Sequence, residues 1–237
     1  MQTVVTIAKR ELASFFDSLT AYLLLVAFLA FSGLLTWIYG SDVFIRGQAE
    51  MDAFFGVAFW TLFFFIPALT MRMIAEEKRS GTIELLLTKA VSNRQLVLGK
   101  FMACLGLIGI ALLFTLPYYI TISTLGNIDH GAVWCGYLGL LLMSGAYIGI
   151  GLFASSITNN QIVAFLLALF IGIFFHFIFG MLASGASGFV GSLLNNLSLS
   201  THFGSITRGV IDTKDLIYFL SLTGLGLFLA EVNISKR

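Results

Sequence analysis

The sequence predicts an all-α polytopic membrane protein, and both its composition and its long apolar runs support this fold class. Its mean hydropathy is +0.97 and 11% of its 237 residues are charged, whereas about a quarter of the residues of a soluble domain are charged. A helix of about 20 apolar residues crosses the hydrocarbon core of a bilayer. The runs predict a single transmembrane domain over residues 1–237, with six spans at about 19–39, 54–73, 101–123, 133–155, 161–182 and 215–233. The sixth span looks short for a membrane crossing, because its apolar part covers only 216–230.

The residues before the first span predict a helix that lies in the membrane interface. One helical stripe is apolar and the charged residues lie off it, as in interfacial helices; the stripe consists of Leu12, Phe15, Phe16 and Leu19. The alternative is a cytoplasmic extension of the first span. A cleaved signal peptide is not expected, because the first apolar run is too long and no small-residue cleavage site follows it.

The distribution of basic residues predicts that both termini are cytoplasmic. With six spans and the N-terminus inside, ten of the thirteen Lys and Arg residues fall on the cytoplasmic side. Those on the outside are Arg46, Arg208 and Lys214. Because cytoplasmic loops carry the excess of Lys and Arg, this orientation is the expected one.

The only substantial cytoplasmic connection predicted by this topology is the charged segment AEEKRSGTIELLLTKAVSNRQL at 75–96. We expect two short helices that meet at Ser80–Gly81, with Ser80 capping the second and Glu84 in its first turn. A capping box at 92–95 predicts the start of the third span, and a similar pattern at 158–161 predicts the start of the fifth. A rigid segment of mixed charge is suited to docking another protein. The alternative is a solvated loop that merely obeys the positive-inside rule.

The block IPALTMRMIAEEKRSGTIELLLTKAVSNRQLVLGKF at 66–101 resembles the ABC-2 type permeases. Together with GLFASSITNNQIVAF at 151–165 and the turn at 126–129, it is most similar to the GldF-like, gliding-motility-type branch of that family. The resemblance implies a transmembrane permease subunit of an ATP-driven transporter, in which 75–88 forms a coupling helix seated on a separate ATPase. The implied coupling residues are Glu76, Glu77, Gly81, Thr82 and Glu84, which match the motif, with Lys78 and Arg79, which match it in charge.

The same resemblance implies the partners and the location of the chain. The expected partners are a cytoplasmic ABC ATPase that binds ATP and magnesium, a second copy of the permease, and an accessory membrane protein with a large extracytoplasmic domain. The expected location is the bacterial inner membrane. It also implies re-entrant helices at 183–214, where the sequence is too apolar for a simple loop and too short for a folded domain. The complex would export a substrate or do mechanical work on the extracytoplasmic partner.

The chain itself is expected to be non-catalytic, with no metal or cofactor of its own. It has no phosphate-binding loop, because Gly99-Lys100-Phe101 lacks both the hydroxyl after the lysine and the upstream glycine. A rhomboid-like intramembrane serine protease is one alternative, suggested by GASG at 185–188. It is disfavoured because no His lies in the last span to serve as the base.

An ATP-independent membrane carrier is the other alternative. Such carriers keep charged residues inside their spans, and here Arg72, at the end of one span, is the only one within the first five. His176 is the remaining titratable candidate, either as a structural residue or as a contact on the substrate path. Gly145, Gly149 and Gly151 predict a face for close helix packing within the chain rather than a dimer seam.

Overall fold

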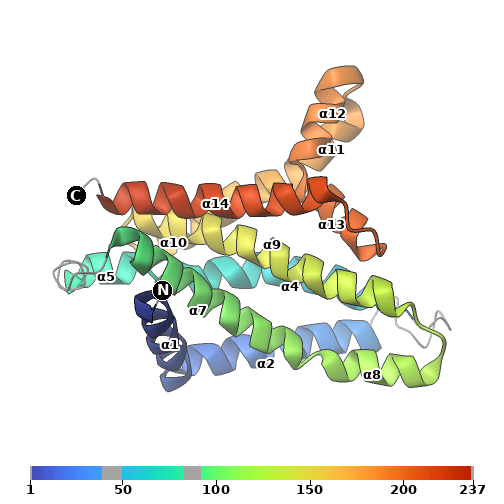
Figure 1. Ribbon diagram of the computed structural model, residues 1–237, viewed down its shortest axis with the longest axis horizontal. Coiled ribbons are helices and arrows are strands. Elements are labelled where there is room, and N and C mark those ends of the chain that lie inside the picture. The colour runs from blue at the N-terminus through green and yellow to red at the C-terminus, as the bar shows by residue number, and fades with distance from the viewer. Residues whose placement is uncertain (1, 39–49, 83–91, 236–237) are drawn as a thin grey trace.

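The computed structural model describes residues 2–38, 50–82 and 92–235, and every regular element in these ranges is a helix (Figure 1). The all-helical prediction is therefore confirmed for this part of the chain. Within these ranges, five helical segments are long and apolar enough to cross a membrane: Asp52–Ser80, Asn93–Leu125, His130–Ile157, Gln161–Gly185 and Thr213–Ser235. A sixth results if the bent pair of helices at the N-terminus counts as one span.

The last helix, α14 (Thr213–Ser235), is longer than its apolar run suggests. It has 23 residues, which at 1.5 Å per residue is about 35 Å and enough to cross the hydrocarbon core. The apolar run at 216–230 is flanked by Asp215 and Glu231. The helix includes both of these acidic residues and is therefore longer than the run at each end. Asp215 is buried inside the helix and Glu231 lies four residues before its end.

Helix α9 (His130–Ile157) lies in the middle of the bundle, in contact with α4 (Asp52–Thr70), α7 (Asn93–Leu113), α10 (Gln161–Ile173) and α14. Glycines allow α9 and α14 to touch at the backbone. A Cβ atom added to Gly226 would lie 2.5 Å from the carbonyl carbon of Gly149. Gly145 and Gly151 face Thr223 and Thr70 of the same chain, so the prediction of a packing face within the chain is confirmed.

The bundle has two distinct ends (Figure 1). We call one the α5 end, since it carries α5 (Ala75–Ser80), the starts of α7 and α10, and the end of α14. The other, the α8 end, carries α8 (Leu116–Leu125), the start of α9, and α13 (Leu199–Thr207). The break between α7 and α8 falls at 114–115, directly before the first turn of α8, which contains Pro117.

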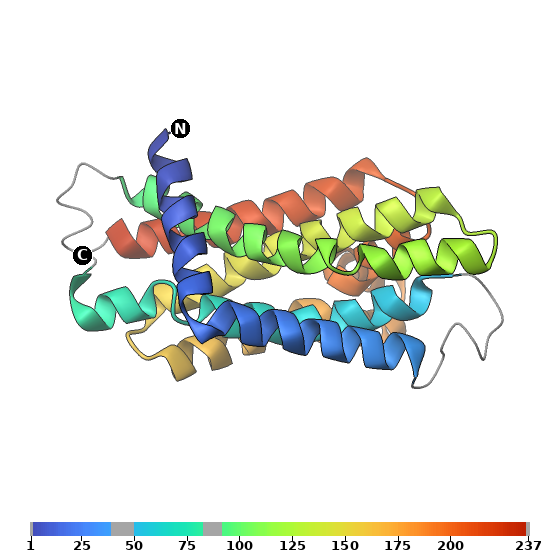
Figure 2. The ribbon, with the colours of Figure 1, turned by 90° about the horizontal axis from the view of Figure 1, so that it is seen from below.

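The N-terminal helix α1 (Gln2–Asp17) is separate from α2 (Leu19–Trp37). The two helices are bent by 75° relative to each other, and α1 runs across the bundle where it packs on α7 (Figure 2). Gly99 permits this contact, because a Cβ there would lie 2.5 Å from Cγ2 of Ile7. Helix α1 is therefore not a straight continuation of α2.

The segment after α10 consists of short helices. A π-helical turn, η1 (Phe174–Ile178), leads into α11 (Phe179–Gly185), so the fifth helical segment runs beyond the predicted end at 182. Helices α11 and α12 (Gly188–Leu197) pack on each other and project from the bundle, and α13 returns to pack on α9 (Figure 1).

The helix caps differ in part from those predicted. The capping box at 92–95 is confirmed: Ser92 Oγ accepts from the amide of Gln95, and Gln95 Oε1 accepts from the amide of Ser92, both at 3.2 Å. The box at 158–161 is wrong, because α10 is capped by Asn160, whose Oδ1 accepts from the amide of Ile162 at 2.9 Å. Asn is as good a cap as Thr and lies next to the helix, so it takes this position.

The first of the two short helices expected around Ser80–Gly81 is α5, which ends at Ser80. Ser80 Oγ donates to the carbonyl of Glu76 at 2.9 Å. Gly81 follows with φ of +71°, a left-handed conformation that favours glycine and commonly ends a helix. The second expected helix, with Glu84, falls on 83–91, outside the described residues.

Candidate coupling site at the α5 end

Helix α5 is fastened to α9 at its first residues. Ser155 Oγ of α9 accepts from the amides of Ile74 and Ala75 at 3.1 and 3.0 Å, and donates to the carbonyl of Met71 at 2.9 Å. One hydroxyl thus satisfies backbone groups that a helix start leaves unpaired. Ser155 could not be found from the sequence, since a serine near the end of an apolar span has no distinguishing pattern.

A buried ion pair ties α5 to α7 and α1. Lys100 Nζ of α7 lies 2.6 Å from Glu77 Oε1 and 3.6 Å from Glu11 Oε1 of α1. The Lys100 side chain is 1% exposed, and those of Glu77 and Glu11 are 17% and 15% exposed. A buried ammonium must be paired to offset its lost hydration. A lysine directly before a long apolar run is the signal by which Lys100 could have been found.

The next residue of α5 is also turned inward. Lys78 is buried, and its ammonium donates to the carbonyl of Ser156 at the end of α9. The amide of Asn233, near the end of α14, donates to the same carbonyl and to Ser156 Oγ. The inner side of α5 is thereby bonded to α9 directly and, through Ser156, to α14.

The remaining predicted coupling residues lie on the surface. Glu76, Arg79, Gly81 and Thr82 are exposed at the α5 end. The structure therefore divides the predicted set, with Glu77 and Lys78 facing the bundle and the others facing outward. Glu84 lies outside the described residues.

A polar cavity of about 360 Å³ opens between α1 and α5. Charged side chains of both signs line it: Glu11, Arg72, Glu76, Glu77 and Lys100. Arg72 stacks its guanidinium over the ring of Phe15 at 5.7 Å and donates to Ser18 Oγ at 3.4 Å. The α5 end thus presents a charged, hydrogen-bonding surface directly beside the apolar bundle.

This arrangement agrees with a comparison against protein families. A family model described as ABC-2 family transporter protein matches residues 46–230, which include α5 and the helices from α4 to most of α14. The chain belongs to the ABC-2 transporter family. Members of this family are membrane components of ABC transporters, so the bundle of this ABC-2 protein is a multi-pass membrane domain. A comparison with curated proteins gave no significant match.

His176 of this ABC-2 protein lies inside the bundle. Its side chain is 2% exposed, its Nδ1 lies 2.6 Å from the hydroxyl of Tyr147, and its ring stacks between Phe59 and Phe63 at 4.1 and 4.5 Å. It is brought there by η1, and π-helical turns frequently occur at functional sites. The contacts favour the structural interpretation of His176 in this conformation.

The protease alternative finds no support in the placement of the histidines. His130 bonds the hydroxyl of Tyr119, His176 that of Tyr147, and His202 bonds Asp215 and the carbonyl of Asn196. Among the described residues, none of these rings hydrogen-bonds a serine. Within the same ranges, no group of three or more His, Cys, Asp or Glu side chains is placed to hold a metal ion.

Proposed function

We propose that this chain is the permease subunit of an ATP-driven ABC-2 exporter and that α5 couples it to a separate ATPase subunit, which binds ATP and magnesium. The α5 end faces the cytoplasm, both termini are cytoplasmic, and the chain crosses the bacterial inner membrane six times. The observation that carries the proposal is the division of α5 into an inner side bonded to the bundle and an outer side left exposed.

The outer side of α5 is the proposed docking surface for the ATPase. Glu76 and Arg79 give it charges of both signs, and Gly81 ends the helix so that Thr82 remains accessible. Complementary charges fix the register of two docked surfaces. Glu84, which lies outside the described residues, is included among the proposed coupling residues because it matches the motif.

The inner side of α5 is the proposed transmission path. Force applied to α5 reaches α7 and α1 through Glu77 and Lys100, and α9 through Ser155 and Lys78. Buried hydrogen bonds and ion pairs of this kind hold α5 and the helices it contacts in one relative geometry, whereas a flexible loop would absorb the displacement of α5. The whole bundle would then respond to closure of the ATPase.

The partner subunits, the placement of α1 and the role of His176 belong to the same proposal. A second copy of the chain completes the translocation route, an accessory membrane protein supplies a large extracytoplasmic domain, and α1 lies in the cytoplasmic interface. The resemblance to GldF-like permeases supports mechanical work on that accessory protein as one form of the output. His176 would meet a substrate only in a conformation that opens the contacts around its ring.

The docking role is tested by charge reversal on the exposed side of α5. The tagged chain is purified in mild detergent, and the accompanying proteins are identified and assayed for ATPase activity. Arg79→Glu is expected to lower the recovered ATPase about tenfold, because a like charge replaces an attractive one at the interface. Lys9→Glu is the matched control, since Lys9 is exposed on α1, and it is expected to retain the ATPase.

Two results would contradict the proposal. Full recovery of the ATPase with Arg79→Glu would show that α5 is not the docking surface. Absence of any ATPase from the unaltered preparation would overturn the permease assignment itself and favour an ATP-independent carrier.

A further inference from the structure

A buried histidine–aspartate pair joins α13 to α14 at the α8 end. His202 Nδ1 lies 2.6 Å from Asp215 Oδ1, and His202 Nε2 lies 2.9 Å from the carbonyl oxygen of Asn196. The side chains of His202 and Asp215 are 7% and 1% exposed. The His202 ring stacks on Tyr218 at 4.1 Å, and the Tyr218 hydroxyl donates to the carbonyl of Leu197 at 2.7 Å. These contacts hold the end of α12 and His202 of α13 against the start of α14.

The hydrogen bonds of this pair fix how many protons it holds. Both partners of the imidazole are oxygens, and a carbonyl oxygen can only accept. Each of the two contacts therefore needs one proton, supplied either by a doubly protonated His202 beside a carboxylate or by a neutral His202 beside a protonated Asp215. In both cases the pair as a whole is neutral, which suits its burial.

Loss of one proton breaks one of the two contacts. If the proton leaves the site between the side chains, the Nδ1 lone pair faces the carboxylate. If the proton leaves Nε2, the Nε2 lone pair faces the carbonyl oxygen of Asn196. Both arrangements are repulsive and leave a net charge inside the protein. Asp215 Oδ2 has no hydrogen-bond partner among the described residues, so the carboxylate has no second donor to compensate.

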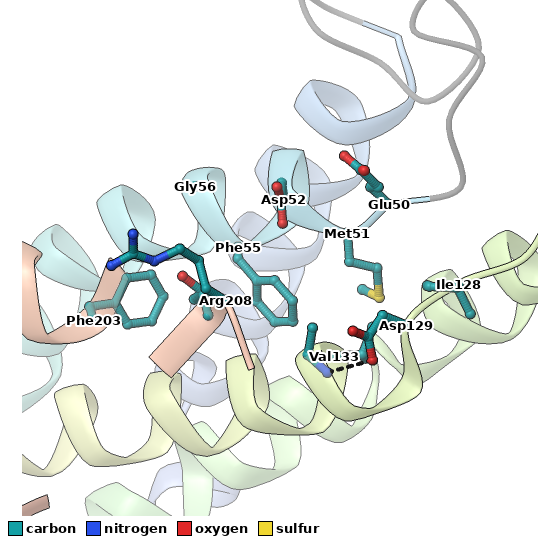
Figure 3. A pocket seen from close by; sticks show the side chains of 12 residues that line it. Glu50, Met51, Asp52, Phe55, Gly56, Ile128, Asp129, Val133, Phe203 and Arg208 are labelled. Atoms are coloured by element: carbon teal, nitrogen blue, oxygen red, sulfur yellow. Dashed lines mark hydrogen bonds between the residues drawn. The ribbon is translucent and has the colours of Figure 1, made fainter. Parts of the chain in front are cut away.

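The opposite side of α13 forms one wall of a cavity of about 430 Å³ at the α8 end (Figure 3). Phe203 and Arg208 from the α13 region line it together with Phe55 of α4 and Val133 of α9. Because Phe203 follows His202 directly in the chain, a displacement of His202 from Asp215 displaces this wall as well.

We propose that His202 and Asp215 form a proton-binding latch that sets the position of α13 and thereby the shape of the cavity between α4, α9 and α13. The latch is closed while the pair holds two protons and opens when rising pH removes one. The proposal uses only contacts at the α8 end and does not rest on the coupling role of α5.

Other titratable or charged side chains occur on the elements packed around the latch. They are Asp212, Lys214, Tyr218 and Glu231 on or beside α14, Arg208 at the end of α13, His176 in η1, and Asp129, His130, Cys135, Tyr137 and Tyr147 on or beside α9. Helix α12 has none. Asp212 and Lys214 are exposed and pair with each other at 3.2 Å, while His130 and Tyr137 bond Tyr119 and Thr115. Tyr218 contacts the latch but already donates its hydroxyl proton to a carbonyl.

The latch is tested by measuring a distance between α13 and α8 as a function of pH. Cys104 and Cys135 are replaced by alanine, spin labels are attached to cysteines at Arg208 and Leu125, which are both exposed, and the full chain is studied in phospholipid nanodiscs. We expect one distance at the lowest pH of the series and a second distance that gains population as the pH rises. For release of a single proton, the ratio of the two populations changes about tenfold per pH unit.

Asp215→Asn is the decisive variant. An amide can either accept from a protonated Nδ1 or donate to a deprotonated one, so the contact to His202 survives in both states and the pH response is expected to disappear. His130→Gln is the control, because it removes an exposed histidine at the same end of the bundle, and it is expected to keep the response. A distance that does not change with pH in the unaltered pair, or a response that persists in Asp215→Asn, would overturn the latch.

Discussion

Lys100 carries its charge at a position that is 1% exposed, so its ammonium depends on the carboxylates of Glu77 and Glu11. Glu77→Gln is expected to lower the free energy of unfolding by about 3 kcal/mol, because removal of one partner leaves a buried charge incompletely paired. The measurement is the midpoint of thermal unfolding in detergent. Glu76→Gln makes the same chemical change one residue earlier on the exposed side of α5 and is expected to leave the midpoint unchanged. Equal midpoints for the two variants would show that the Glu77–Lys100 pair does not stabilise the bundle.

Single residues were predictable where a local pattern determines them. Ser92 and Gln95 form the predicted capping box because such a box needs only two residues three positions apart and a following helix. The motif around Glu77 indicated a coupling segment but not the direction in which each side chain points. That direction is set by the turn at 71–74 and by Ser155, which lies about 80 positions away along the chain. A sequence pattern contains no information about such a distant contact.

The crossing of α9 and α14 gives a prediction at the level of elements. Gly226→Ala would place a methyl group 2.5 Å from the backbone of Gly149, so the helices must separate, at a cost of about 1–3 kcal/mol. Gly224→Ala is the matched control, because a Cβ atom there meets nothing within 4 Å in the same helix. We expect the midpoint of thermal unfolding to fall for Gly226→Ala alone, whereas a similar effect of both substitutions would mean that glycine content rather than close contact determines the stability of α14.

Element types were predictable from hydrophobicity, but several element ends were not. The apolar run at 216–230 underestimates α14, since burial of Asp215 against His202 lets the helix begin before the apolar residues do. The break between α2 and α1 also depends on packing, because α1 lies on α7 through Gly99 and Ile7. Helix ends that depend on a contact with another helix cannot be found from the composition of the helix itself.

At the scale of the whole molecule, the bundle carries two buried clusters of charged side chains at opposite ends. The cavity with Lys100 and Glu77 lies at the α5 end, and the latch of His202 and Asp215 lies at the α8 end. The family and the multi-pass bundle followed from the sequence, since hydropathy and one charged motif are enough to indicate them. The latch did not, because His202 and Asp215 belong to different helices and neither stands in a recognisable motif.

The exposed side of α10 predicts where a second copy of the chain packs. Ile162, Leu166, Phe170 and Ile173 form one exposed apolar stripe on this helix, and α11 and α12 leave the bundle directly after it (Figure 1). A cysteine at Phe170 is therefore expected to form a disulfide-linked dimer in native membranes on mild oxidation, in a chain whose Cys104 and Cys135 are replaced by alanine. Leu220→Cys is the control, because Leu220 is also apolar and about 61% exposed but lies on α14. Cross-linking through Leu220 instead of Phe170 would move the dimer contact to α14, and cross-linking through neither position would contradict a dimer contact on α10. The choice between α10 and α14 also bears on His176. If the dimer contact lies on α10, then η1, which follows α10 and carries His176, lies next to the route between the two copies.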